Sequence, residues 1–236
     1  MRTEVLTYLQ NNADEKYRQF SLKLLPKDTK LLGVRIPLLR QYAKTLLKEG
    51  RAQLYLNIPL QDLKYQEEFM LHALILANAK MPSQDKIALI KKFIPHINTW
   101  AVCDIFCADL KEVKQNRDLF YETFKPLLTS HQEYQIRFFY VLALSYFITP
   151  EYLAKIFQHI KTQTYTGYYD KMAVAWLISI AYIKFLKETE AFLLNTPLDE
   201  FIFRKSISKI CDSFRIKKET KVRLKTLASV RKTNKA

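Results

Sequence analysis

Apolar residues recur every three or four positions along almost the whole chain, the spacing that places them on one face of an α-helix. The pattern predicts a series of mostly short helices joined by brief linkers. We expect these helices at residues 2–11, 14–25, 37–49, 62–79, 83–95, 99–111, 116–129, 132–148, 150–162, 167–187, 198–211 and 215–229.

Prolines and short polar residues mark the expected helix starts. Pro37 and Pro150 stand where proline fits the first helical turn. Pro126 is expected to bend or end its helix because it lacks a backbone N–H. The candidate N-caps, whose side-chain oxygens accept backbone N–H groups, are Asp14, Ser83, Asn98 or Thr99, and Thr149.

Glycine is very scarce, with 3 residues in a chain of 236. Sheet proteins use glycine in tight turns, so this scarcity favours an all-α fold. The even spacing suits about six antiparallel helix pairs of roughly 40 residues each, as in HEAT-type repeats. We therefore expect a right-handed α-solenoid with a concave basic face, and a compact irregular helical bundle is the alternative. No low-complexity linker divides the chain, so residues 1–214 are expected to form one domain, followed by a basic helix and tail at 215–236.

The formal net charge is +15, which favours a polyanionic partner such as DNA, RNA or an anionic membrane surface. The stretch FRIKKETKVRLKTLASVRKTNKA at the C-terminal end carries a single acid, Glu219. It is interpreted as a helix and tail that contact nucleic acid. Two simpler interpretations remain, a basic but ordinary soluble protein and a solvated terminal helix.

Three cysteines, Cys103, Cys107 and Cys211, do not form a disulfide framework. Free thiols fit a reducing cytoplasm. The four histidines are scattered, so neither a metal site nor another cofactor is expected. The N-terminus lacks the apolar core of a signal peptide, and no apolar run is long enough to span a membrane. A monomer is the default expectation.

The stretch NTWAVCDIFCADLK places Trp100 one helical turn before Asp104, within a largely apolar segment. A carboxylate in an apolar setting is costly unless it has a partner. Two other predicted helices hold unusual residues, Arg137 before a strongly apolar run and Trp176 in the segment YYDKMAVAWLISIAYIKF. Ordinary explanations exist for each: a core tryptophan, an Arg137–Glu133 pair, or hydrogen bonds from a helix end to Asp104.

A solenoid would place these three helices side by side, since they are alternate members of successive pairs. Two indole faces and a carboxylate form a receptor for a cation. A nearby arginine suits a phosphate. Together these four residues describe a site for a cationic group on a phosphodiester chain.

The chain resembles the AlkD family of alkylpurine DNA glycosylases over nearly its whole length. The segment LLGVRIPLLRQYAK at 31–44 is similar to the family's Gly-hydrophobe-x-x-Pro segment. Trp100 and Asp104 match the family's Trp-x-x-x-Asp spacing, while Arg137 and Trp176 match its arginine and second tryptophan. FIFRKSISKI is similar to the basic segment before the last core helix. The resemblance implies a HEAT-like fold and these four residues as the catalytic set.

The implied reaction is hydrolysis of the N-glycosidic bond of alkylated purines, such as 3-methyladenine or 7-methylguanine, in double-stranded DNA. Asp104 would stabilise positive charge on the sugar, the tryptophans would face the lesion nucleotide, and Arg137 would contact a phosphate. The candidates for further phosphate contacts are Arg35, Arg40, Lys44, Lys111, Lys171, Arg204 and Lys205.

Two other functions remain open from the sequence. One is a non-catalytic binder of branched or damaged DNA on the same solenoid. The other is a helical-repeat scaffold for a protein partner, which the positive charge disfavours unless that partner is acidic. RNA binding is not excluded, although the sequence shows no RRM signature.

Overall fold

The computed structural model describes residues 1–233. Within these residues all regular structure is helical, with fourteen α-helices and four short 3₁₀ helices. The all-α prediction is confirmed. The chain groups into two compact units, the first ending at Asn116 and the second beginning at Arg117, and each is described by itself.

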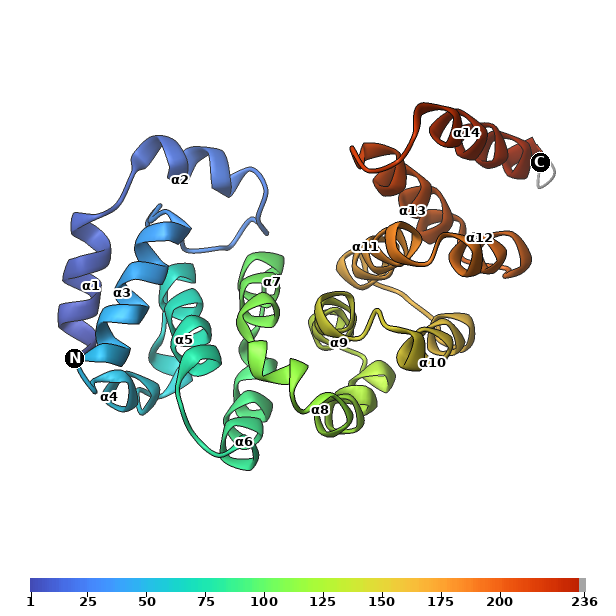
Figure 1. Cartoon of the computed structure of the whole chain (residues 1–236). Coiled ribbons are helices and arrows are strands. Elements are labelled where there is room, and N and C mark those ends of the chain that lie inside the picture. Colours follow the sequence, from blue (N-terminus) through green and yellow to red (C-terminus); the bar gives the residue numbers. More distant parts are fainter. Residues whose placement is uncertain (234–236) are drawn as a thin grey trace. The chain divides into compact units, whose positions relative to one another are not determined.

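The first unit is built from two layers of helices. Its helices are α1 (Arg2–Asn11), α2 (Glu15–Leu22), α3 (Ile36–Lys48), α4 (Ala52–Leu56), α5 (Gln66–Asn78), α6 (Ser83–Phe93) and α7 (Trp100–Asp109). Helices α3, α5 and α7 lie side by side, and α4 and α6 pack against α5 as a second layer (Figure 1). The Phe93 ring on α6 stacks on His72 of α5 and meets Phe106 of α7 edge-on. These rings close the core between the two layers.

The second unit repeats this arrangement. Its helices are α8 (Arg117–Phe124), α9 (Glu133–Tyr146), α10 (Pro150–Thr162), α11 (Tyr168–Lys184), α12 (Leu186–Asn195), α13 (Glu200–Asp212) and α14 (Lys218–Thr233). Helix α11 lies between α9 and α13 (Figure 1). Behind them, Tyr121 of α8 packs on Tyr152 of α10, and Phe157 of α10 stacks on Phe192 of α12. Alternate helices are therefore neighbours within each unit, as expected for stacked helix pairs.

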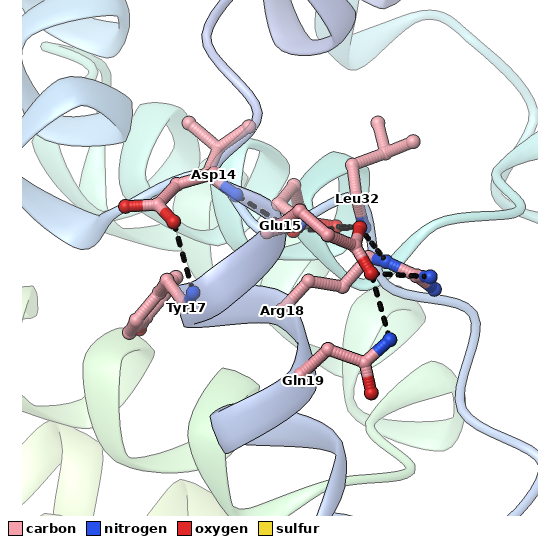
Figure 2. Close-up of polar contacts among 9 residues, drawn as sticks. Asp14, Glu15, Tyr17, Arg18, Gln19 and Leu32 are labelled. Atoms are coloured by element: carbon pink, nitrogen blue, oxygen red, sulfur yellow. Dashed lines mark hydrogen bonds and ion pairs between the residues drawn. The ribbon is translucent and has the colours of Figure 1, made fainter.

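Helix α2 differs from its neighbours because it buries none of its residues. Polar contacts hold its first turn, as Figure 2 shows: the Asp14 carboxylate accepts the Tyr17 N–H at 2.9 Å, and the Glu15 carboxylate accepts from Arg18 and Gln19. The Tyr17 N–H and then Arg35 lower the pKa of Asp14. A helix held mainly by its cap and by side-chain pairs has little packing energy of its own.

Several local predictions are confirmed and others are wrong. Asp14 and Thr99 cap their helices through side-chain oxygens, and α8 ends just before Pro126. Ser83 is not a cap, because Pro82 holds that position. Thr149 stands at the N-cap position of α10 without a side-chain cap bond.

Two helices were not predicted. Helix α4 has five residues, too few to show a helical period, and α12 follows α11 with only Phe185 between them. Phe185 breaks the helix with φ −134° and ψ 67° although no glycine or proline marks the place. The predicted start at 62 was also wrong, since residues 60–62 form a 3₁₀ turn before α5.

The arrangement of helix pairs fits a helical-repeat fold. The number of pairs, the handedness, the concave basic face and the expected boundary at 214/215 stay predictions. Among the described residues, no helix combines the length and the apolar composition that a membrane span requires.

Candidate functional site

The start of α7 is fixed by two polar side chains. The Thr99 hydroxyl accepts the Val102 N–H at 3.4 Å. The buried Gln66 amide, from the first turn of α5, donates to the same hydroxyl. Since α5 and α7 are neighbours, this hydrogen bond fixes the start of α7, and with it Trp100, beside the first turn of α5.

Trp100 and Asp104 lie one turn apart on α7, about 6 Å along the helix axis. Both are partly exposed and line the same cavity of about 220 Å³. Cys103 and Phe106 are fully buried, whereas Ala101 and Ile105 line the cavity beside Asp104. The carboxylate is therefore not in the core: it belongs to the face of α7 that borders the cavity.

The cavity walls are mostly apolar. They come from α2, from the chain between α2 and α3, and from α5 and α7, and the residues are Tyr17, Phe20, Ser21, Leu24, Leu25, Leu31, Val34, Ile36, Glu67, Met70, Trp100, Ala101, Asp104 and Ile105. Apolar walls exclude water and lower the local dielectric, so a charge at Asp104 acts more strongly on a neighbouring cation than it would in water.

Helix α2 and the chain after it form one wall of this cavity. The Trp100 indole N–H donates to the Leu24 carbonyl at 2.9 Å. This bond fixes the plane of the indole ring and leaves its faces for other contacts. Phe20 on α2 is 61 % exposed, so the wall presents an apolar side chain to solvent.

Glu67 anchors the chain between α2 and α3, a role that no sequence pattern predicted. Its fully buried carboxylate accepts the N–H groups of Leu32, Gly33 and Val34, with a shortest distance of 2.6 Å to Gly33. Gly33 has φ +97°, and a Cβ there would lie 2.6 Å from the Asp14 carbonyl oxygen. The loop that lines the Asp104 cavity thus depends on a glycine and a buried carboxylate.

The sequence feature that could have indicated this anchor is the run Gln66-Glu67-Glu68. At a helix start such a run normally indicates solvated side chains, yet all three are buried. Glu68 pairs with Arg2 at 2.9 Å. The three buried side chains at the start of α5 thus connect this helix to other segments: Gln66 to Thr99, Glu67 to the chain before α3, and Glu68 to Arg2.

Arg137 on α9 is only 6 % exposed, and its Nη1 donates to the Tyr169 carbonyl at 3.0 Å. The Glu133 carboxylate accepts the Tyr169 N–H at 2.9 Å. Both side chains of α9 therefore hold the first turn of α11. A Cβ at Gly167 would lie 2.4 Å from the Glu133 carboxylate, so this approach requires glycine. The predicted phosphate contact of Arg137 stays a prediction.

Trp176 on α11 is partly exposed and lines a cavity of about 430 Å³ with Lys209 and Arg215. The Lys209 ammonium lies 5.8 Å from the centre of the indole ring. One face of this tryptophan thus already receives a cation from α13. The side chain is available at the surface, as a contact with a nucleotide would require.

Four of the expected DNA-contacting cations have carboxylate partners. The pairs are Arg35–Asp14 at 2.8 Å, Arg40–Asp109, Lys171–Asp199 at 3.1 Å and Arg204–Glu200 at 2.6 Å. The Arg35–Asp14 and Arg204–Glu200 pairs are exposed and contribute little to stability, so a phosphate can replace the carboxylate at small cost, whereas the Asp109 carboxylate is buried. Lys44, Lys111 and Lys205 are exposed, and the Lys205 ammonium lies 5.7 Å from the Phe201 ring centre.

The structure brings Trp100 and Asp104 together in the first unit. It places Arg137 and Trp176 on neighbouring helices of the second unit. The convergence of all four residues on one patch involves both units and stays a prediction.

The chain is all-helical in its described residues, strongly basic, and built of stacked helix pairs that fit a helical-repeat fold, with an indole and a carboxylate on one cavity. The family model of DNA alkylation repair enzymes matches residues 5–210, so the chain belongs to that family. The resemblance found in the sequence is thereby confirmed, and DNA alkylation repair is the general function. No curated protein matches the chain.

Proposed function

We propose that this protein is a DNA glycosylase that hydrolyses the N-glycosidic bond of cationic alkylated purines in duplex DNA. The observation that carries the proposal is the shared cavity of Trp100 and Asp104 on α7, in a chain of the DNA alkylation repair family. Lesions such as 3-methyladenine and 7-methylguanine are the expected substrates. We further propose that it acts as a monomer in the cytoplasm.

Alkylation at a ring nitrogen gives the purine a positive charge, so the leaving group needs no proton. The C1′–N bond breaks, its electron pair neutralises the base, and positive charge passes to the deoxyribose. Water then adds at C1′ and loses a proton to solvent. The chemistry requires stabilisation of a cation, and neither a metal nor an organic cofactor takes part.

Asp104 supplies that stabilisation. A fixed carboxylate beside the developing sugar cation lowers the barrier electrostatically, and the apolar cavity walls strengthen the effect. The same carboxylate can orient the attacking water. The Trp100 face, held by the bond to Leu24, adds a cation–π contact to the charged nucleotide.

The second unit supplies contacts to the rest of the nucleotide and to the backbone. Trp176 presents its indole to the lesion nucleotide or its sugar. Arg137 contacts the phosphate near the lesion. Further phosphates are contacted by Arg35, Arg40, Lys44, Lys111, Lys171, Arg204 and Lys205.

The test is base release from DNA treated with a methylating agent, followed by chromatography of 3-methyladenine and 7-methylguanine. Asp104→Asn is expected to cut excision ~100-fold or more, roughly 3 kcal/mol, with little loss of DNA affinity. Asp85→Asn removes the same charge from an exposed position on α6 and should excise at the wild-type rate.

Unchanged excision by Asp104→Asn would remove this carboxylate from the mechanism. A wild-type protein that binds DNA but releases no base above the spontaneous rate would instead be a binder of damaged or branched DNA. Failure to bind DNA would favour the protein scaffold.

A further inference from the structure

Arg137 is an unusual residue for a phosphate contact, because its side chain is almost completely buried. It is 6 % exposed, and its Nη1 donates to the Tyr169 carbonyl in the first turn of α11 at 3.0 Å. An exposed arginine samples many rotamers, whereas a buried one points where its partners hold it. The direction of this guanidinium therefore depends on the position of the Tyr169 carbonyl.

Tyr169 is in turn held by two consecutive residues of α9. The Glu133 carboxylate accepts the Tyr169 N–H at 2.9 Å. The Tyr134 ring stacks on the Tyr169 ring, with 5.2 Å between the ring centres and 26° between the ring planes. A charge-assisted hydrogen bond and a ring stack thus fix the residue whose carbonyl receives Arg137.

Glu133 and Arg137 lie one turn apart on the same face of α9. One side chain takes the N–H of Tyr169 and the other takes its C=O, so a shift of this residue changes both contacts together. The chain also leaves room for the carboxylate, because any side chain at Gly167 would overlap it. Glu133 therefore controls the geometry around the Arg137 guanidinium.

Charge alone would disfavour an acid at this place. A carboxylate one turn from an arginine that contacts DNA repels the same phosphates that the arginine attracts. An acid is useful there if it orients the arginine by more than it repels the DNA.

We propose that Glu133 is a positioning residue for the phosphate contact of Arg137. This inference rests on the proposed function, which assigns Arg137 to the phosphate near the lesion. Glu133 holds Tyr169, the Tyr169 carbonyl orients the guanidinium, and the oriented guanidinium meets the phosphate oxygens in the geometry of bidentate pairing. Glu133 acts through Tyr169 and does not itself contact DNA.

The sign of the effect on binding distinguishes this role from a simple effect of charge. Removal of an acid from a protein that binds DNA strengthens binding through electrostatics. Loss of the positioning residue weakens binding, because the arginine no longer meets its phosphate. Glu133→Ala is therefore expected to lower the affinity for DNA about tenfold.

The experiment measures affinity for a duplex that carries a stable abasic-site analogue. The phosphates that flank the analogue are replaced one at a time by uncharged methylphosphonates, and each replacement gives a penalty in affinity. For the wild type we expect a penalty of about tenfold at the phosphate that Arg137 contacts. Arg137→Ala should show none there. Glu133→Ala should reduce the penalty to about twofold at the same phosphate and leave the other positions unchanged.

Three further variants sharpen the comparison. Glu133→Gln keeps an oxygen that can accept the Tyr169 N–H, so it should retain most of the penalty. Gly167→Ala leaves both α9 side chains in place but displaces the carboxylate, so it should lose the penalty as Glu133→Ala does. Glu188→Ala is the matched control, because it removes an exposed acid from the first turn of α12 in the same unit. It should keep the wild-type penalty and should not weaken binding.

A purely structural Glu133 would give a different result. Glu133→Ala would then unfold at a lower temperature but keep the wild-type penalty at every phosphate, and this outcome overturns the positioning role. Gly167→Ala carries the same test in a protein that retains the Glu133 side chain, which matters if Glu133→Ala does not fold.

The measurement needs no base release, so it separates the positioning role from the glycosylase. A Glu133-dependent penalty without base release supports the positioning role and removes the glycosylase. Base release with equal penalties in Glu133→Ala and the wild type does the reverse. Equal penalties in Arg137→Ala and the wild type at every phosphate overturn the positioning role together with the phosphate contact of Arg137.

Discussion

The imidazole of His72 is an ionisable group in the core of the first unit. It is 5 % exposed and stacks on Phe93 with 4.9 Å between ring centres. Among the described residues, its Nδ1 has no hydrogen-bond partner. Burial, with a smaller contribution from His96, lowers its pKa from 6.5 to about 4. The fold therefore holds this side chain neutral.

The low pKa of His72 predicts that acid destabilises the first unit. Between pH 6.5 and about 4 the unfolded chain binds a proton at this histidine and the folded chain does not. The free energy of unfolding thus falls as pH drops through this window, by at most about 3 kcal/mol from this residue. Denaturant unfolding of the wild type and of His72→Leu at pH 7 and pH 4.5 measures the effect.

His72→Leu should lose less stability than the wild type between these two pH values. His131→Gln, which removes an exposed imidazole, should keep the wild-type pH dependence. Equal pH dependence in all three proteins would show that His72 is protonated in the folded state.

At the level of single residues, the spacing in the sequence correctly predicted which side chains lie together when they share a face of one helix. Trp100 and Asp104 are four positions apart, so any helix there places them together, and they line one cavity. Glu67 and His72 were not found, because their roles depend on partners far away in sequence. The apolar neighbours of Asp104 suggested burial, but Asp104 is partly exposed: Cys103 and Phe106 are buried, while Ala101 and Ile105 line the cavity beside the carboxylate.

At the scale of elements, the chain between α2 and α3 has almost no helical packing of its own. Its position depends on the Glu67 carboxylate and on the left-handed Gly33. This loop supplies Leu25, Leu31 and Val34 to the Asp104 cavity. Loss of the anchor should therefore affect both stability and the shape of the Asp104 cavity.

Glu67→Gln keeps the size of the side chain but removes its charge and turns one acceptor into a donor. We expect a loss of roughly 2 kcal/mol in unfolding free energy, since charge-assisted bonds to buried N–H groups are removed. Amide hydrogen exchange at Leu32, Gly33 and Val34 should accelerate more than exchange in α11. Glu49→Gln, at an exposed carboxylate of the same unit, is the control and should change neither quantity.

Unaltered exchange at these three amides in a folded Glu67→Gln protein would show that the loop is held by its apolar contacts alone. Excision should fall through kcat, because the loop shapes the cavity around Asp104. A change confined to KM would contradict that role.

At the scale of the whole molecule, composition predicted the fold class and the polyanionic partner. Scarce glycine and a helical period are properties of the entire chain, and all regular structure in its described residues is accordingly helical. The division near Asn116 was not predicted, since only a short 3₁₀ turn and no glycine or proline separate α7 from α8. Compact units arise from contacts between distant helices, which local patterns do not encode.

Charge on the layer of α9, α11 and α13 leads to a prediction about DNA binding. Arg204 and Lys205 lie on α13, and neither is required for the core. Replacing both with glutamine should weaken binding uniformly across sequences. It should also flatten the plot of log affinity against log salt, by about one unit for each phosphate that the variant no longer neutralises. Affinity measured for one duplex at several salt concentrations gives the slope.

Lys161 on α10 and Lys187 on α12 provide the matched control, since both are exposed and belong to the outer helices of the same unit. Their double replacement by glutamine changes the net charge by the same amount. If DNA binds to α9, α11 and α13, the control keeps the wild-type slope and the Arg204/Lys205 variant does not. Equal slopes in the two variants would mean that binding responds to total charge alone, and the DNA surface would then have to be sought elsewhere.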